Sequence, residues 1–356
     1  MSAPTSTAEP RDALTTPAPR LAITLGDPSG IGAEIIARTL AAAPALAARA
    51  HIFGDAGVLA RGARVAGVTL PALTLHQVTQ LDLERDAPHG QPTRAGGAAQ
   101  VAYLEAATRA LAAREPGARL DALITAPISK AAAQAAGFGF PGHTEFLAAR
   151  AGAVPVAMML AGPRLRVVLA TIHVALADVP RLLTSAAVTQ AIMLAAAALR
   201  RDFALARPRI AVAGLNPHAG EQGAFGDEEA RIIAPAIAAA RDQAAAAGTD
   251  GDGDAGVDVD VDVEISGPHV PDAVFRAASE GRFDAVVCMY HDQGLIPVKL
   301  LDFEEAVNVT LGLPYPRTSP DHGVAYDIAG QGVARATSFQ RALELADRLA
   351  RGRRGG

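Results

Sequence analysis

The sequence is poor in several residue types, and their scarcity limits what the protein can be. It contains a single cysteine, Cys288, no tryptophan, and only 4% aromatic residues. One cysteine excludes an intramolecular disulfide, and its place within an apolar run suits a buried thiol in a reducing compartment. We therefore expect a cytoplasmic protein rather than a secreted one.

A basic tract and a long apolar run are also missing. The 32 Lys and Arg residues nearly balance the 37 Asp and Glu residues, for a formal net charge of -5, which argues against a nucleic-acid partner. Residues 1–18 are rich in Ala, Pro, Thr and Ser, so we interpret them as a flexible tail and not as a signal peptide. Ala-rich segments such as 191–199 are too short to cross a bilayer, so we expect no membrane partner.

What the chain does contain is enough apolar material for a large core. Half of its 356 residues are hydrophobic, which leaves room for two domains of ordinary size. Short apolar runs without alternation indicate strands covered on both faces, and longer Ala, Leu and Arg segments indicate the covering helices, so we predict an α/β fold. The predicted strands are 21–25, 121–125, 165–171, 210–214 and 284–290, and the predicted helices are 31–48, 97–114, 182–206 and 228–247.

Residues 248–264 form an unusual acidic segment that alternates Asp with Gly and then with Val. Its density of Asp and Gly opposes a stable helix, so we predict a mobile surface insertion. The acidic spacing resembles a calcium loop only superficially, because no Glu stands at position twelve and no helix pair flanks it in register.

Polar clusters follow four of the predicted strands, at 125–130, 171–173, 216–221 and 290–294. Ligands of open α/β sheets bind outside the carboxyl ends of strands, so we expect these clusters to face one crevice. Three of them contain a histidine: His173, His218 and His291. Three neutral imidazoles without cysteines suit a borderline divalent metal ion and leave coordination positions open for a substrate. Asp292 is placed either to orient an imidazole or to cap a helix.

Other residues suggest anion binding. The segment 26–32 follows a strand and opens a helix, and it is either an anion-binding turn or a simple tight turn, since it matches neither phosphate-loop spacing. His143 and Thr144 stand beside small residues. Lys299, Asn308 and Arg317 follow within an otherwise apolar stretch, as a set suited to a phosphate and a carboxylate.

Five motifs in order, between about residues 20 and 350, resemble the 4-hydroxythreonine-4-phosphate dehydrogenase family of vitamin B6 biosynthesis. They are Gly-Asp-Pro-Ser-Gly-Ile-Gly-Ala-Glu (26–34), Gly-His-Thr-Glu-Phe (142–146), Gly-Leu-Asn-Pro-His-Ala-Gly-Glu (214–221), Tyr-His-Asp-Gln-Gly (290–294) and Arg-Thr-Ser-Pro-Asp-His-Gly (317–323). The resemblance implies a two-domain α/β/α sandwich like that of isocitrate and isopropylmalate dehydrogenases. We assign 19–135 with 303–352 to the first domain and 136–302 to the second.

The resemblance also implies roles for individual residues. His173, His218 and His291 would bind one divalent ion (zinc, cobalt, magnesium or manganese), with His291 reaching across a homodimer interface. His143, Thr144, Lys299, Asn308 and Arg317 would hold a small phosphorylated hydroxy amino acid. Residues 322–332 resemble a nucleotide-binding loop, in which His322, Gly323 and Asp327 would contact the cofactor.

The implied reaction is NAD-dependent oxidation of 4-(phosphooxy)-L-threonine at its 3-hydroxyl, followed by decarboxylation to 3-amino-2-oxopropyl phosphate. Lys130 and Asp292 are both candidates for proton transfer, and the sequence does not choose between them. An acidic Asp327 near the ribose would favour NAD, with NADP as the alternative. The competing interpretations are a dehydrogenase of threonate or erythronate phosphate or of a cis-dihydrodiol, a metal-assisted phosphate-ester hydrolase, and a non-catalytic binding protein.

Overall fold

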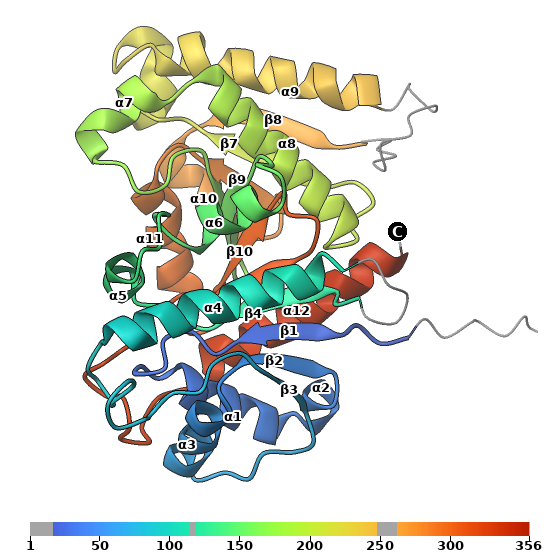
Figure 1. Cartoon of the computed structure of the whole chain (residues 1–356). Coiled ribbons are helices and arrows are strands. Elements are labelled where there is room, and N and C mark those ends of the chain that lie inside the picture. The colour runs from blue at the N-terminus through green and yellow to red at the C-terminus, as the bar shows by residue number, and fades with distance from the viewer. Residues whose placement is uncertain (1–16, 114–118, 248–261, 356) are drawn as a thin grey trace, which may run out of the picture.

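The computed structural model describes residues 17–113, 119–247 and 262–355 of the chain, and these form helices around one sheet (Figure 1). The prediction of an α/β fold is confirmed. The predicted tail lies outside the described residues except for its last two positions, and 248–261 of the acidic segment lie outside them as well.

Eleven strands of the described residues form a single sheet in the order β3-β2-β1-β4-β11-β10-β5-β6-β9-β7-β8. The strands are β1 (Leu21–Thr24), β2 (Ala50–Gly54), β3 (Thr74–Gln77), β4 (Ala122–Thr125), β5 (Ala157–Ala161), β6 (Arg166–Leu169), β7 (Arg209–Ala213), β8 (Glu264–His269), β9 (Ala285–Cys288), β10 (Val307–Leu311) and β11 (Arg317–Pro320).

The direction of the strands reverses in the middle of the sheet. Strands β1, β2, β3, β4 and β11 are parallel, and β6, β9, β7 and β8 are parallel to one another. Between these halves, β10 is antiparallel to β11 and β5, and β5 is antiparallel to β6. The two halves therefore run in opposite directions. β10 belongs by sequence to the predicted first domain, yet it pairs with β5 of the second and joins the two.

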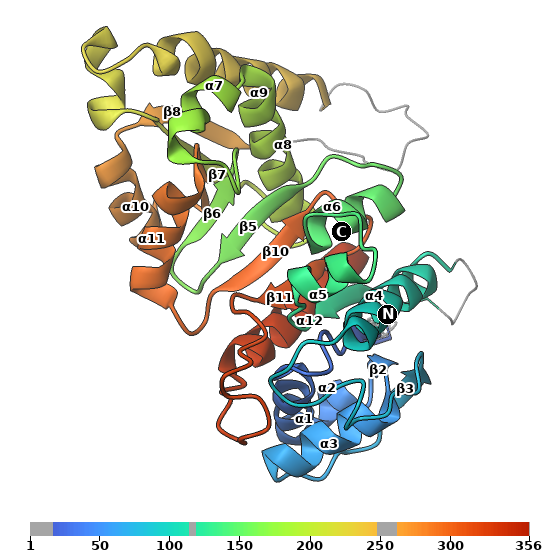
Figure 2. The ribbon, with the colours of Figure 1, turned by 60° about the vertical axis from the view of Figure 1, so that its left-hand side comes forward.

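Helices cover both faces of this sheet (Figure 2). In the first half α4 packs on β1, β2 and β4, while α12 packs on β4, β10 and β11. In the second half α8 packs on β6, β7 and β9, while α11 packs on β6 and β9. The helices are α1 (Gly32–Ala42), α2 (Pro44–Ala47), α3 (Ala56–Ala66), α4 (Arg94–Leu111), α5 (Lys130–Ala135), α6 (His143–Arg150), α7 (Val179–Leu182), α8 (Ser185–Arg201), α9 (Ala234–Ala247), α10 (Pro271–Ser279), α11 (His291–Asp302) and α12 (Thr337–Gly355), with short turns η1 (Leu176–Asp178), η2 (Pro217–Gly223) and η3 (Glu229–Ile233).

Local chemistry explains where the predicted helices were misjudged. The predicted helix 31–48 is divided before Pro44, because proline cannot continue the hydrogen-bond ladder of α1. α4 begins earlier than predicted, at Arg94, because the Thr93 hydroxyl accepts from the amide of Gly96 at 2.9 Å and caps the helix.

The end of the acidic segment was predicted wrongly. Glu264, assigned to a mobile insertion, is the first residue of β8. β8 is the last strand of the sheet, beside β7.

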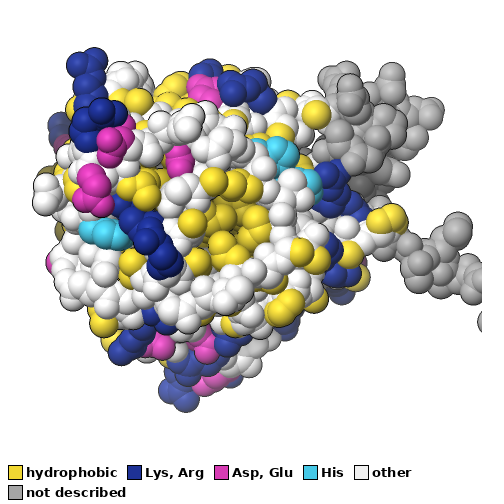
Figure 3. Space-filling model, turned by 60° about the horizontal axis from the view of Figure 1, so that its bottom comes forward, with side chains coloured by type: hydrophobic (Ala, Val, Ile, Leu, Met, Phe, Trp, Pro, Cys, Tyr) yellow, Lys and Arg dark blue, Asp and Glu magenta, His cyan; other side chains and the backbone are white. Residues whose placement is uncertain are grey.

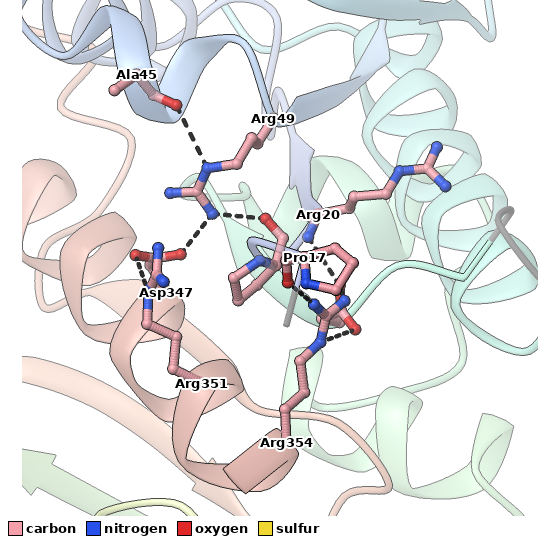
Figure 4. A network of polar contacts seen from close by, with 9 residues as sticks. Pro17, Arg20, Ala45, Arg49, Asp347, Arg351 and Arg354 are labelled. Carbon is pink, nitrogen blue, oxygen red and sulfur yellow. Dashed lines mark hydrogen bonds and ion pairs between the residues drawn. The ribbon is translucent and has the colours of Figure 1, made fainter. Parts of the chain in front are cut away.

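The last helix is tied to the beginning of the chain by a network of charged side chains (Figure 4). Arg49 donates to the Pro19 carbonyl and to Asp347 of α12, each at 2.6 Å. Arg354, near the end of α12, pairs with Asp121 at 2.6 Å and donates to the Pro17 carbonyl. Residues at both ends of the described chain thus stabilise one another beside β1.

The surface is of mixed character. On the face drawn in Figure 3, hydrophobic side chains gather in a patch with both basic and acidic side chains around it. Among the described residues no single helix is long and apolar enough to cross a membrane, and only the pair Leu176–Leu182 and Ser185–Arg201, bent by 93°, passes by length and composition.

Candidate active site

A cavity of about 320 Å³ lies where the strand direction reverses, over β5, β10 and β11. Three of the four predicted polar clusters contribute to it, those beginning at Thr125, Thr171 and Tyr290, whereas the cluster 216–221 does not. These three clusters face one cavity, as predicted, although β4 runs opposite to β6 and β9 in the sheet. The predicted site residues that line the cavity are Lys130, His143, Thr144, His173, His291, Asn308, Arg317, His322 and Gly323.

Arg317 is the anchor of the cavity and is only 3% exposed. It is the first residue of β11, and its guanidinium donates to the Thr310 hydroxyl at 3.1 Å and to the Thr125 hydroxyl at 2.6 Å. Burial lowers the pKa of Arg317 to about 10, so the group stays positively charged at neutral pH. Its Nε is buried without a partner among the described residues. A fixed cation with a free donor suits an anionic group of a ligand.

Three further buried polar atoms in the cavity lack partners within the described part of the chain: His143 Nε2, Asn308 Oδ1 and His322 Nε2. Buried polar atoms are nearly always hydrogen-bonded in folded proteins, so unpartnered ones gathered around one cavity indicate a polar ligand. Burial, with the charges of Arg317 and Lys130, lowers the pKa of His143 well below its ordinary value. Its imidazole is therefore neutral at neutral pH and can donate one hydrogen bond and accept another.

Two of the three predicted metal ligands lie together in one chain. The rings of His173, which follows β6, and His291, which begins α11, have centroids 5.7 Å apart. Burial, followed by the charges of Lys130 and His291, lowers the pKa of His173, which favours the neutral imidazole that a metal ion requires. The resemblance implied that His291 serves a partner's site, but here it stands beside His173 of its own chain.

His218 is the predicted ligand that the cavity does not contain. It lies in η2 with a left-handed φ of 53°, and its ring faces Phe225 at 6.0 Å between centroids. Within residues 17–113, 119–247 and 262–355, no group of three or more His, Cys, Asp or Glu side chains is placed to hold a metal ion. The described residues of one chain therefore do not bring the three predicted histidines together.

Asp292 and Lys299 also lie outside the cavity lining. Asp292 is 71% exposed and contacts His291, whose Nδ1 lies 2.7 Å from its Oδ1. The Asp292 carboxylate therefore contacts the His291 imidazole and is not part of the cavity lining. Lys299 forms an ion pair with Asp321 at 2.9 Å, and Asp321 does line the cavity.

Segment 26–32 is a tight turn and not an open anion site. The amide of Ser29 donates to the Asp27 carboxylate at 2.8 Å, and that of Gly30 donates to the Asp27 carbonyl at 3.1 Å. The amide of Ile31 donates to the Val324 carbonyl at 3.1 Å. These donors are already satisfied, so the tight-turn interpretation is the correct one.

The turn instead supports the loop 322–332. The Tyr326 hydroxyl donates to the second oxygen of the Asp27 carboxylate at 2.6 Å, which adds a side-chain contact to the backbone bond from Ile31. In the same loop Asp327 is exposed, and a side chain at Gly323 would meet no atom within 4 Å. The loop thus offers a free carboxylate and open backbone beside the cavity.

Glu145 and Asp321 line the cavity as well, and the sequence argument assigned neither of them a function. Both stand inside motifs already quoted, next to His143 and Thr144 in one case and His322 in the other. Their positions beside predicted site residues were the sequence signal that could have identified Glu145 and Asp321.

Comparison with known proteins agrees with this architecture. Residues 46–346 match the model of the family described as "Pyridoxal phosphate biosynthetic protein PdxA". The chain belongs to the PdxA family. A relative named 4-hydroxythreonine-4-phosphate dehydrogenase from Geobacter metallireducens is 49% identical over 94% of this chain and 96% of its own length. The prediction of the family from the five motifs is confirmed.

Solved structures of similar proteins extend the comparison. The crystal structure of 4-hydroxythreonine-4-phosphate dehydrogenase from Klebsiella pneumoniae has a TM-score of 0.81 and 38% identity, covering 94% of this chain and 99% of that one. A terephthalate 1,2-cis-dihydrodiol dehydrogenase from Burkholderia xenovorans has a lower TM-score, 0.64, at 32% identity, covering 93% of this chain and 98% of its own. By TM-score and by identity, this chain resembles the structure from Klebsiella pneumoniae more closely than the one from Burkholderia xenovorans.

Proposed function

We propose that this protein catalyses the NAD-dependent oxidation of 4-(phosphooxy)-L-threonine in pyridoxal phosphate biosynthesis. Hydride leaves C3 for NAD while the 3-hydroxyl loses its proton, and the resulting β-keto acid loses carbon dioxide to give 3-amino-2-oxopropyl phosphate. The observation that carries the proposal is the set of buried, unpartnered polar atoms around Arg317, set beside a pair of facing imidazoles. Such a cavity suits a substrate with an anionic end and a reacting hydroxyl.

The anionic end of the substrate would lie against Arg317. The free Nε of Arg317 and the unpartnered Nε2 of His143 are buried in the same cavity, and Asn308 adds an amide. Thr144 adds a hydroxyl beside His143. Lys299 would reach the phosphate by exchanging its ion pair with Asp321 for one with the incoming anion.

A divalent metal ion fits this site in part. His173 and His291 would hold it, because the surroundings of His173 favour its neutral form and the contact with Asp292 orients His291. When bound, a divalent ion would polarise the substrate's hydroxyl and carbonyl oxygens. The third ligand in this proposal is His218 supplied by a second copy of the chain, since the described residues of one chain bring only His173 and His291 of the three predicted ligands together.

A homodimer has further support from α11. Ile296, Leu300 and Phe303 are 57%, 80% and 73% exposed; the first two lie four residues apart on α11, and Phe303 is the residue that caps its carboxyl end. Large apolar side chains grouped on one exposed helix face are typical of a protein interface. An interface here would place the second chain close to the cavity.

Lys130 is the group that we assign to proton transfer. It lines the cavity, whereas the other candidate, Asp292, does not. After the larger effect of burial, its positive charge also lowers the pKa of His143 and of His173, which line the same cavity.

NAD would lie along the loop 322–332, where it accepts the hydride. His322 and Gly323 line the cavity at the start of this loop, and the exposed carboxylate of Asp327 can accept hydrogen bonds from ribose hydroxyls while repelling a 2′-phosphate. We therefore propose NAD as the preferred cofactor over NADP.

The test is the reduction of NAD, followed at its absorbance band, with 4-(phosphooxy)-L-threonine as substrate. Erythronate 4-phosphate, threonate 4-phosphate and a cis-dihydrodiol are assayed in parallel, and release of inorganic phosphate is measured without NAD. We expect the highest kcat/KM with 4-(phosphooxy)-L-threonine. A higher kcat/KM with another substrate, or phosphate release without NAD, would overturn the proposal.

A further inference from the structure

The cavity contains very little negative charge. Among the described residues that line it, the carboxylates are those of Glu145 and Asp321. Asp321 is neutralised by Lys299 at 2.9 Å. The Glu145 side chain is exposed and forms no hydrogen bond or ion pair with the described residues, so its charge is available to a ligand.

Glu145 lies close to the groups that would hold the substrate. It is the third residue of α6 and lies on the same helical turn as His143. Its Oε2 is close to Gly142, 3.5 Å from the position that a Cβ atom would occupy there. Burial lowers the pKa of Arg317, and the negative charge of Glu145 raises it in opposition. The carboxylate therefore lies within the electrostatic influence of the group that would hold the substrate's anion.

The candidate substrates differ in one group. 4-(Phosphooxy)-L-threonine carries an ammonium at C2, where threonate 4-phosphate carries a hydroxyl, while both share the carboxylate, the 3-hydroxyl and the terminal phosphate. The cationic groups of the cavity serve the shared anions. Only the amino acid brings a positive charge, and it needs an acceptor.

We propose that Glu145 binds the C2 ammonium and selects the amino acid phosphate over the hydroxy acid phosphate. The inference rests on the proposed function and names the residue that sets its substrate class. Glu145 would act in two ways. Its carboxylate attracts the ammonium of the amino acid phosphate, and it is left without a cationic partner when the hydroxy acid phosphate binds, because a hydroxyl then stands in place of the ammonium.

A purely structural function of Glu145 makes a different prediction. A carboxylate in the first turn of a helix stabilises that helix through the dipole of the backbone. Its removal would then lower the melting temperature and reduce activity toward both substrates by the same factor.

The experiment compares the two substrates in Glu145→Gln, which keeps the size of the side chain and removes its charge. We expect kcat/KM for 4-(phosphooxy)-L-threonine to fall roughly ten-fold while kcat/KM for threonate 4-phosphate does not fall. Glu280→Gln is the matched control, since Glu280 pairs with Arg276 on α10, outside the cavity lining, and should change neither value.

Asp321→Asn separates the two carboxylates. Because Asp321 holds Lys299, which serves the phosphate common to both substrates, this variant should change both kcat/KM values in the same proportion. Dissociation constants of the two compounds, measured by calorimetry without NAD, should show the same pattern as the rates.

The outcomes are distinct. If Glu145→Gln leaves the ratio of the two kcat/KM values unchanged in an enzyme whose wild type oxidises 4-(phosphooxy)-L-threonine, the inference is wrong and the proposed function stands. If Asp321→Asn alone changes that ratio, the ammonium is bound by Asp321 and the inference is also wrong. If the wild type oxidises neither compound, the proposed function fails and the inference fails with it.

Discussion

Arg317 shows how much of the site depends on a single side chain. Its guanidinium uses two nitrogens to bind Thr310 and Thr125 and leaves Nε free, which no ammonium can reproduce. We expect Arg317→Lys to lower kcat/KM for 4-(phosphooxy)-L-threonine roughly ten- to hundred-fold, and to affect unphosphorylated 4-hydroxythreonine much less. Steady-state kinetics with both compounds provide the measurement.

The control for this substitution is Arg335→Lys, which makes the same change in an exposed residue paired with Glu304. It should leave both substrates unaffected. An equal loss toward the phosphorylated and unphosphorylated compounds in Arg317→Lys would mean that Arg317 supports the fold and does not bind the phosphate.

Among the elements, the loop 322–332 depends on the turn 26–32 through one side-chain contact. Tyr326→Phe leaves a buried oxygen of Asp27 without its donor, so we expect the free energy of unfolding to fall by about 1–3 kcal/mol. The KM for NAD should rise, because the loop loses an anchor. Urea denaturation and steady-state kinetics test the two effects.

Tyr315→Phe is the matched comparison, since the described residues include no hydrogen-bond partner of the Tyr315 hydroxyl. Tyr315→Phe should lower the free energy of unfolding by clearly less than Tyr326→Phe does. A normal KM for NAD in a destabilised Tyr326→Phe would show that the loop does not bind the cofactor.

The edge formed by β1, β2 and β3 carries a second element-scale prediction. Arg20, which can only donate, bonds His51 Nε2 at 3.0 Å, so His51 Nδ1 carries the proton that it donates to His76 at 3.0 Å. Burial, then Arg20, then His76 lower the pKa of His51 to about 4, whereas an unfolded histidine titrates near 6.5.

The unfolded chain protonates His51 at a higher pH than the folded chain does. The contribution of His51 to stability is therefore complete above about pH 6.5 and is lost as the pH falls toward 4. We expect His51→Gln, which keeps an acceptor for Arg20, to show a weaker loss of unfolding free energy between these pH values. Urea denaturation across that range is the measurement, and equal pH dependence in both proteins would refute the prediction.

For the whole molecule, the exposed apolar face of α11 predicts that the chain works as a dimer. Leu300 is 80% exposed, so Leu300→Glu should not disturb the core of one chain but should place a charge in the proposed interface. We expect a monomer by analytical ultracentrifugation, with an unchanged far-ultraviolet circular dichroism spectrum and little activity. A variant that remains dimeric would show that the interface lies elsewhere.

Mixed dimers test which histidine crosses between chains. If His173 and His291 act in one chain and His218 acts in the other, mixing His173→Ala with His218→Ala rebuilds one intact site in each hybrid. Random exchange should then restore about a quarter of wild-type activity. Mixing His173→Ala with His291→Ala should restore none. The reverse pattern would support the assignment that the family resemblance implied.

Much of this protein could be predicted from its sequence because the signals are local. Apolar runs such as 21–25 and 121–125 are close to the observed strands β1 and β4, since a strand covered on both faces needs continuous apolar residues. The motifs around His143 and Arg317 placed both residues correctly in one cavity, because each motif keeps its side chains on a short, rigid segment.

What only the tertiary structure decided depends on contacts between distant segments. The cavity lies at a reversal of strand direction produced by β10 and β5, and no local pattern reports which strand pairs with which. The pairing of Lys299 with Asp321, the proximity of His173 to His291 and the absence of His218 from the cavity follow from that arrangement. The sequence by itself determined which chemical groups the site can use, because residue types set their chemistry. Their distances and partners were decided by the tertiary structure, because these depend on how separate segments pack together, such as those of His173 and His291, which stand more than a hundred residues apart.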